Sequence, residues 1–228
     1  MASSTERKGR TLGGLTPLTT AQRRALAGLK QLGVLDGVYL AGGAAVAEHL
    51  RHRMSNDLDF FSLSAELDIE GVRRRVLSAA KAVVVAQSDA TLKLVVSGAM
   101  VDFVCYPYPP LARFKSGPEG VRVAGLRDLA VMKLAAIARR GVRRDYWDLY
   151  EILTRSRVSL RSACDDYVVK FGVAEADLYH VLRAVGWFEE AESDPAFPKG
   201  LTKARWAVIR EWFEPRAAKE LLRRTSGR

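Results

Sequence analysis

The hydrophobic pattern of this 228-residue chain changes near residue 125, and the change restricts the folds that the chain can adopt. Before that point, short runs rich in β-branched and aromatic residues alternate with helical stretches. After it, the apolar residues follow only a helical spacing, beginning with LRDLAVMKLAAIARR at 126–140. We therefore expect an α+β first half followed by a helical second half.

The apolar runs and their stop signals place the expected elements. Strands are expected at 37–43, 56–62, 82–87, 90–97 and 100–107. Short SD and SG turns separate the last three strands, which indicates an antiparallel meander. Helices are expected at 21–33, 44–53, 67–80, 126–140, 143–154, 158–171, 174–185 and 201–213, with Thr19 or Thr20 capping the first and the last ending before Pro215.

A Pro- and Gly-rich stretch separates the two halves. It contains YPYPPL at 106–111 and SGPEG at 116–120, both typical of loops. We predict a flexible N-terminus at 1–17, a first lobe at 18–124 and a helical lobe at 125–228.

The charge balance favours a polyanionic partner. The chain has 36 Lys and Arg against 26 Asp and Glu, a net charge of +10. RNA, DNA or a nucleotide is a better candidate than a membrane surface, although the excess is also compatible with a role in solubility alone. Basic residues cluster at 73–75, at 139–144 and in KELLRRTSGR at 219–228, and such clusters can hold an RNA backbone.

The sequence gives no indication of export or membrane insertion. MASSTERKGR at the start lacks the apolar core of a signal peptide. No uncharged apolar run approaches the roughly 18 residues that span a bilayer. Cys105 and Cys164 are too few for a disulfide framework, and no CxxC spacing indicates zinc. We expect a cytoplasmic protein without a membrane partner.

Two aspartates share one face of the strand expected at 56–62. Asp57 and Asp59 are two residues apart, so their side chains point to the same side, about 6.5–7 Å apart along the strand. Burying both carboxylates without a partner costs several kcal/mol, and a divalent cation with oxygen ligands removes that cost. The alternative is an exposed edge strand with two solvated acids.

Two further features accompany the acidic pair. Gly42 and Gly43 lie where an expected strand gives way to a helix, and backbone N–H groups at a helix N-terminus bind phosphate. Asp102 lies inside the apolar run VDFV, where an unpaired acid is unfavourable, although an arginine partner is an alternative. Together, the three acids and the Gly-Gly turn predict a site for metal-dependent nucleotidyl transfer.

Two blocks of the sequence resemble the AbiEii/AbiGii toxin family, which are minimal nucleotidyltransferases of the DNA-polymerase-beta-like superfamily. The first block is LAGGAAVAEHLRHRMSNDLDFFS at 40–62, followed by Asp102 as the third acid. The second is VMKLAAIARRGVRRDYWDLYEIL at 131–153, which matches a helical lysine followed by RDxxDLxxL. The resemblance covers roughly residues 37–155, and residues 156–228 resemble no family that we can name.

The resemblance implies roles for individual residues. Asp57, Asp59 and Asp102 would bind Mg²⁺ or Mn²⁺, and Asp102 could also take the proton from the attacking hydroxyl. Lys133 would contact the triphosphate and be oriented by an ion pair with Asp148. The remaining residues expected to bind the nucleotide are Gly42, Gly43, Arg53 and Ser55.

Some alternatives stay open. Lys133 could simply extend to solvent from an apolar helix, and Ser55 could be a turn residue. Asp145 could pair with Arg143 or Arg144. Ala44 departs from the family pattern, in which a serine or threonine often follows the glycines, so backbone donors would have to hold the triphosphate.

The resemblance also implies a fold and a function. The fold would be a small nucleotidyltransferase lobe with a mixed β-sheet and flanking helices, followed by a helical lobe that completes the active site. The chain would be the toxin of a toxin–antitoxin system that transfers NMP from an NTP to RNA, at the 3′ end of tRNA, and so blocks translation. Its partners would be an NTP, tRNA or another RNA, and a cognate antitoxin encoded nearby. The alternatives are nucleotidyl transfer to a small molecule or protein, and a non-catalytic nucleic-acid-binding regulator.

Overall fold

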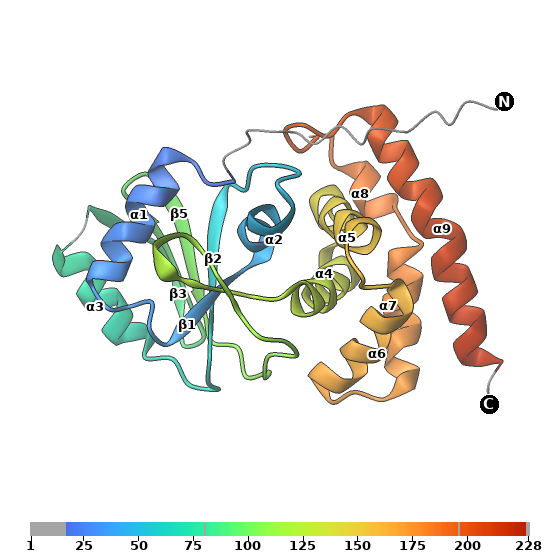
Figure 1. Ribbon diagram of the computed structural model, residues 1–228, viewed down its shortest axis with the longest axis horizontal. Coiled ribbons are helices and arrows are strands. Elements are labelled where there is room, and N and C mark those ends of the chain that lie inside the picture. Colours follow the sequence, from blue (N-terminus) through green and yellow to red (C-terminus); the bar gives the residue numbers. More distant parts are fainter. Residues whose placement is uncertain (1–16, 80, 196, 227–228) are drawn as a thin grey trace, which may run out of the picture.

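A computed structural model describes residues 17–79, 81–195 and 197–226 (Figure 1). The flexible segment expected at 1–17 lies outside the described residues, apart from Pro17. A β-sheet with its helices forms one side of the molecule, and a group of helices forms the other. Every strand in the described residues precedes Ala124, and α4 begins at Leu126. The division between lobes at 124/125 remains a proposal.

The described residues contain a seven-stranded sheet in the order β3-β4-β5-β2-β1-β7-β6. The β2–β5 and β1–β7 pairs are parallel and the other pairs are antiparallel, so the predicted mixed sheet is confirmed. The expected meander is also confirmed, because β3, β4 and β5 are consecutive antiparallel neighbours. The strands are β1 (Val38–Ala41), β2 (Asp57–Ser62), β3 (Ala82–Ser88), β4 (Thr91–Val96), β5 (Ala99–Val104), β6 (Lys115–Ser116) and β7 (Arg122–Val123).

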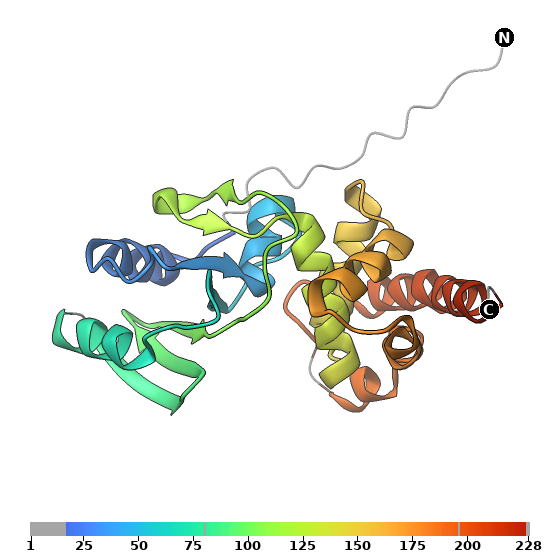
Figure 2. The same ribbon diagram turned by 90° about the horizontal axis from the view of Figure 1, so that it is seen from below.

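The strands β6 and β7 correct the prediction that 106–120 and its flank are only a loop. They form a short hairpin at the edge of the sheet opposite β3 (Figure 2). Val123 lies beside Leu40 of β1, and both side chains are fully buried. This burial holds a two-residue strand that has no pattern of its own in the sequence.

The helices form two groups. In the first half they are α1 (Thr20–Gln31), α2 (Gly42–Leu50) and α3 (Ile69–Ala79); in the second half they are α4 (Leu126–Arg140), α5 (Arg143–Arg155), α6 (Leu160–Phe171), α7 (Leu178–Val185), α8 (Glu189–Ser193) and α9 (Lys203–Thr225). Thr19 caps α1 as expected, since its hydroxyl accepts a hydrogen bond from the backbone N–H of Gln22 at 3.1 Å. No helix in the described residues is long and apolar enough to cross a membrane.

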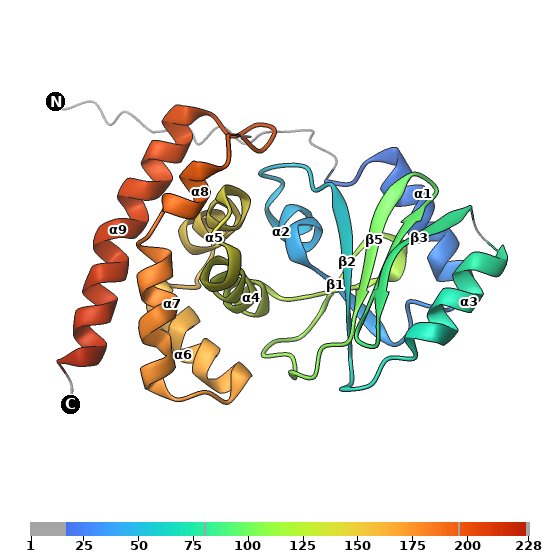
Figure 3. The ribbon, with the colours of Figure 1, turned by 180° about the vertical axis from the view of Figure 1, so that it is seen from behind.

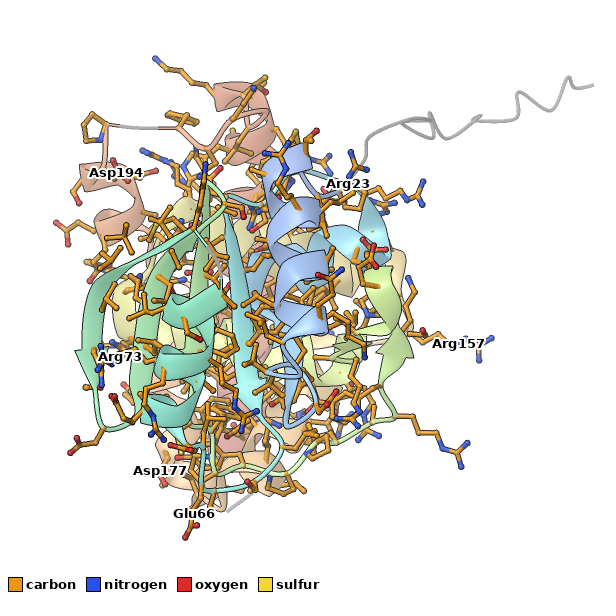
Figure 4. The ribbon with its side chains drawn as sticks, turned by 90° about the vertical axis from the view of Figure 1, so that its left-hand side faces the viewer. Arg23, Glu66, Arg73, Arg157, Asp177 and Asp194 are labelled. Atoms are coloured by element: carbon orange, nitrogen blue, oxygen red, sulfur yellow. The ribbon has the colours of Figure 1, made fainter. Side chains whose placement is uncertain are left out.

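The sheet lies between two layers of helix. The helices α1 and α3 cover one face (Figure 4), where alternating residues such as Leu58 and Phe60 of β2 are fully buried. The helix α2 lies on the other side of β1 and β2, between the sheet and the helices α4 and α5 (Figures 1 and 3). The strand face that carries the odd-numbered residues of β2 is therefore the one that can meet the helical group.

The helix α9 corrects a second prediction, because it continues through Pro215 to Thr225. Proline has no N–H for the carbonyl of Glu211, which normally ends or kinks a helix. Here Phe213 and Ala217, on either side of the proline, are both buried, and the Trp212 ring lies 5.5 Å from that of Tyr150. Burial on both sides of Pro215 offsets the missing hydrogen bond and keeps the helix continuous.

Candidate active site

The three predicted acids lie on one face of two neighbouring parallel strands. Asp59 of β2 is directly beside Asp102 of β5, and Asp57 lies two residues earlier on the same face. Each acid is partly exposed, while its strand neighbours on the other face are buried. The parallel β2–β5 pairing thus brings together acids that are 43 or more residues apart in the chain.

Burial and mutual repulsion affect two of these acids. Burial raises the pKa of Asp59 to about 6; Lys133 opposes this shift, whereas Asp102 and Asp57 add to it. Burial also raises the pKa of Asp102, although Lys93 of β4 forms an ion pair with it at 3.0 Å. The Oδ1 atom of Asp102 is buried and has no hydrogen-bond partner among the described residues. The negative charges of these acids are therefore only partly compensated by neighbouring cations and hydrogen-bond donors.

The glycines start α2 beside these acids. Gly42 has a φ of +60°, and a Cβ there would stand 1.9 Å from Oδ2 of Asp59. A Cβ on Gly43 would stand 2.5 Å from Nη2 of Arg53. No side chain caps this helix N-terminus. The absence of two β-carbons lets Asp59 and Arg53 approach the first turn of α2.

A buried ion-pair network connects α4, α5 and the segment after α2. Nζ of Lys133 lies 2.8 Å from Asp145 and 2.7 Å from Asp148. Arg53 donates through Nε and Nη2 to the two oxygens of Asp148, at 2.6 and 2.7 Å. His52 Nε2 is 2.8 Å from the same carboxylate. The predicted pair between Lys133 and Asp148 is thus present, with Arg53 as a further partner.

Asp145 has its own set of partners. It bonds Lys133 at 2.8 Å and accepts a hydrogen bond from Nε of Arg140 at 2.8 Å. The structure thus pairs Asp145 with residues of α4, where the sequence analysis considered Arg143 or Arg144. Burial alone would raise the pKa of Asp145, but Lys133 and Arg140 hold it below the ordinary value.

A cavity of about 450 Å³ brings most of the predicted residues together. Asp148 is the exception, because it is fully buried behind the wall and touches Lys133 and Arg53 rather than the cavity. Ser55 lines the cavity and also donates its hydroxyl to the carbonyl of Asp57 at 3.2 Å, as a turn residue does. The predicted residues that line the cavity are Gly42, Gly43, Arg53, Ser55, Asp57, Asp59, Asp102 and Lys133.

The sequence analysis missed several residues of this site. Lys93 was detectable, because an SG turn at 97–98 pairs Val96 with Ala99 and hence Lys93 with Asp102. Arg140 ends α4 and reaches Asp145 across Gly141, whose φ of +50° makes the turn. His52 had no signal, since only the tertiary structure places it on Asp148. The other missed lining residues are Met54, Asn56, Val142, Asp194, Phe197, Pro198 and Lys199, whereas Arg143 and Arg144 belong to the basic cluster predicted at 139–144.

The segment between α8 and α9 forms one rim of the cavity. Arg143 donates hydrogen bonds to the carbonyls of Asp194 and Glu192. Its guanidinium also lies 4.2 Å from the ring centre of Phe197. Arg143, at the first turn of α5, thus holds this segment against the cavity.

The acids suit a divalent cation in their chemistry. Carboxylate oxygens are the ligands that Mg²⁺ and Mn²⁺ prefer, and Oδ1 of Asp102 is a buried oxygen without a partner in the described residues. As the side chains stand, no three His, Cys, Asp or Glu residues of the described chain converge on one point. Lys93 contacts Oδ2 of Asp102, which leaves Oδ1 of the same carboxylate as the oxygen available to a cation.

Comparison with known proteins identifies the family. The family model described as "Nucleotidyl transferase AbiEii toxin, Type IV TA system" matches residues 85–219, more than half of the chain. The match includes Asp102 and the block at 131–153. It also extends to 219 and so covers most of 156–228, a stretch for which the sequence blocks named no family.

A relative and two solved structures agree with this match. An uncharacterised protein of Aquifex aeolicus (strain VF5) is 30% identical over 207 residues, covering 90% of this chain and 98% of its own length. MenT4, the nucleotidyltransferase toxin Rv2826c of Mycobacterium tuberculosis H37Rv, has a similar fold, with a TM-score of 0.53, 17% identity and coverage of 87% of this chain and 85% of its own. The antibiotic-resistance factor ANT(2'')-Ia gives a TM-score of 0.52 at 13% identity, covering 71% of this chain and 96% of its own.

The family match covers the second of the two sequence blocks, and the similarity in fold to MenT4 extends over 87% of this chain. The chain therefore belongs to the AbiEii family of nucleotidyltransferase toxins.

Proposed function

We propose that this protein transfers NMP from an NTP to an RNA acceptor, at the 3′ end of tRNA, and acts in the cytoplasm as a toxin that blocks translation. One observation carries the proposal. A single cavity holds the strand acids Asp57, Asp59 and Asp102 on one side and the cationic Lys133 and Arg140 on another. Negative groups for a metal ion beside positive groups for phosphate are what nucleotidyl transfer requires.

The helical wall would bind the triphosphate. Lys133 is held between Asp145 and Asp148, which keep its ammonium group charged although it is buried, and burial alone would lower its pKa. Asp148 also fixes Arg53, so it acts as a positioning residue behind the wall. The uncapped first turn of α2 at Gly42 adds backbone donors for phosphate.

The strand acids would serve the attacking hydroxyl and the metal ion. Asp57, Asp59 and Asp102 would hold Mg²⁺ or Mn²⁺, which when bound neutralises charge on the phosphates. Asp102 would also take the proton from the attacking hydroxyl, as the family resemblance implies, and its buried Oδ1 has no hydrogen-bond partner among the described residues.

Surface charge supports RNA as the acceptor. The net charge is +10, and Arg144 and Lys199 line the cavity. By contrast, Arg224 of the C-terminal cluster is engaged by Asp165, Glu175 and Glu220. We therefore assign the RNA contact to the 139–144 cluster and the cavity rim. An antitoxin partner follows from the family alone.

The test is transfer of labelled NMP. The protein is incubated with Mg²⁺, total tRNA and each labelled NTP in turn, beside Asp59→Ala and, as a matched control, Asp36→Ala, whose side chain is 76% exposed. We expect label on tRNA with one or two NTPs, unchanged for Asp36→Ala and lost for Asp59→Ala.

Other outcomes would favour the alternatives. If a protein or a small molecule is labelled and no RNA is, that molecule and not RNA is the acceptor. If expression of the protein inhibits growth and Asp59→Ala inhibits it equally, the protein acts as a non-catalytic nucleic-acid-binding regulator instead.

A further inference from the structure

A row of apolar side chains leads from the strand acids to the free edge of the sheet. In the strand register, Asp57 of β2 lies beside Met100 of β5, Met100 faces Val95 of β4, and Val95 faces Val83 of β3. Paired residues on neighbouring strands share one face of a sheet. Met100, Val95 and Val83, here called the apolar row, therefore lie on the same face as the acids.

The apolar row is open at its outer end. Val83 is 66% exposed, and Val85, in the bulge after Val84, is 53% exposed. The helix α3 packs on the opposite face, and β3 forms the outer border of the sheet (Figure 4). In Figures 1 and 3, the helix α2 lies over β1 and β2 instead. The strand β3 contains no charged residue, and its two exposed valines lie at the edge of the sheet. Exposed apolar residues at such an edge are typical of a surface that binds another molecule.

The distance from Asp57 to Val83 suits the end of a polymer, such as a nucleic acid, better than a small-molecule acceptor. Neighbouring strands are about 4.8 Å apart, so the apolar row begins about 5 Å from Asp57 and extends roughly 10 Å further to Val83. The next row of the same face holds Asp59, Asp102 and Lys93. A molecule on the apolar row thus has its end at the acids and a cation beside it.

We propose that the apolar row holds the unpaired bases at the 3′ end of the acceptor RNA, next to the hydroxyl that reacts. This inference rests on the proposed function and names the acceptor side of the same site. Unpaired bases present apolar faces that pack on apolar side chains, while their phosphates need cations. Lys93 lies on the same sheet face, in an ion pair with Asp102 at 3.0 Å that a phosphate would share, and the chain as a whole carries a net charge of +10.

Val83→Asp tests the inference, with Val169→Asp as matched control. Val169 on α6 is 72% exposed, so the control makes the same charge change on an exposed valine far along the chain. For Val83→Asp we expect the KM for tRNA to rise at least tenfold, with the KM for NTP unchanged and the thermal midpoint within a few degrees of wild type. The control should leave both KM values unchanged.

A second measurement does not depend on kinetics. A tRNA with a photoreactive base at its 3′ end should cross-link to the peptide that spans 82–96. Cross-links confined to the helices α5–α9 would overturn the inference.

The outcomes separate this inference from the proposed function. Transfer to RNA with the same tRNA KM in Val83→Asp and wild type would overturn the inference alone. No transfer to any RNA by the wild type would overturn the proposed function and this inference with it. Transfer to a protein segment that Val83→Asp weakens would assign the row to an extended peptide instead.

Discussion

Individual residues of the site differ in how fully their charges are compensated. Asp148 is fully buried, and Lys133, Arg53 and His52 surround its carboxylate. Burial would raise the pKa of Asp148, but Lys133 and Arg53 hold it well below its usual range. Asp59 is in the opposite position, with two like charges nearby. These two aspartates should therefore respond to neutralisation in opposite directions.

Asp148→Asn should destabilise the protein by about 3–5 kcal/mol at pH 7, because it leaves Lys133 and Arg53 buried without their shared anion. The matched control is Asp166→Asn, which removes the pair of Asp166 with Arg127, a side chain that is 53% exposed. That change should cost at most about 1 kcal/mol. Denaturant unfolding checks both. Equal losses of unfolding free energy in the two variants would show that burial of the network does not increase the cost of removing an ion pair.

The pH dependence of this loss follows from the sign of the shift. Asp148 has a lower pKa folded than unfolded, so its stabilisation is complete above about pH 4, the ordinary pKa of aspartate. It is lost as the pH falls through the folded value. The stability gap between wild type and Asp148→Asn should stay constant from pH 8 to 5 and narrow below about pH 4.

Asp59→Asn should stabilise the metal-free protein. The folded pKa is about 6, above the unfolded value, so wild-type stability falls as the pH rises from about 4 to about 6. Because Asp59 is partly exposed, we expect a gain of about 1–2 kcal/mol at pH 8 that vanishes at pH 4. Mg²⁺ should raise the melting temperature of the wild type but not of the variant. If the stability gain of Asp59→Asn is as large at pH 4 as at pH 8, it does not come from removing the charge of Asp59.

At the scale of elements, the first turn of α2 brings the backbone of Gly42 and Gly43 next to the strand acids. Gly42 combines a left-handed backbone with a close approach to Asp59. Gly98, in the turn between β4 and β5, has a φ of +84° but open space around it. The two positions therefore share a left-handed backbone, which would strain any other residue, and differ in what a new Cβ would contact.

Gly42→Ala should abolish transfer, because the new Cβ would collide with Asp59 and displace either the acid or the helix start. Gly98→Ala should cost about 1 kcal/mol of stability from its left-handed backbone and leave transfer intact. Unfolding and labelled-NTP assays on both variants check this. Full activity in Gly42→Ala would show that the first turn of α2 is not part of the site.

At the scale of the whole molecule, the cavity belongs to both halves of the chain. The sheet supplies the acids, and α4 and α5 supply Lys133 and its carboxylates. The contact of Arg53 with Asp148 joins the two halves directly behind the cavity wall. The proposed RNA acceptor would meet Arg144 and Lys199, which line the cavity, so its binding should depend on salt.

Lys199→Gln should weaken RNA binding at low salt and lower the slope of log K against log salt by about 0.7, the value for one phosphate contact of single-stranded RNA. Lys30→Gln on α1 is the matched control, since the Lys30 side chain is 45% exposed and remote in sequence from the rim. Its slope should equal that of the wild type. Fluorescence anisotropy of labelled tRNA measures both. Equal slopes for the two variants would remove Lys199 from the RNA path.

Features that follow from neighbouring residues could be predicted from the amino-acid sequence. Alternation of apolar and acidic residues in DLDFFS decided which face of β2 is buried, because successive side chains of a strand point to opposite sides. Gly42 marked the turn at which α2 begins, and the turns after β3 and β4 set the meander. These features depend only on residues close together in the chain.

Features that depend on residues far apart in the chain emerged only from the three-dimensional fold. The register of β2 against β5 put Asp102 beside Asp59 and Val83 in line with Asp57. The packing of α5 placed Asp148 behind the cavity rather than in it, with His52 as a partner that no pattern indicated. Packing likewise carried α9 through Pro215. Local helix propensity differs by up to about 0.7 kcal/mol between ordinary residues and by about 3 kcal/mol for proline, whereas burying one large apolar side chain contributes about 1.5–3 kcal/mol, so several three-dimensional contacts together decide these cases.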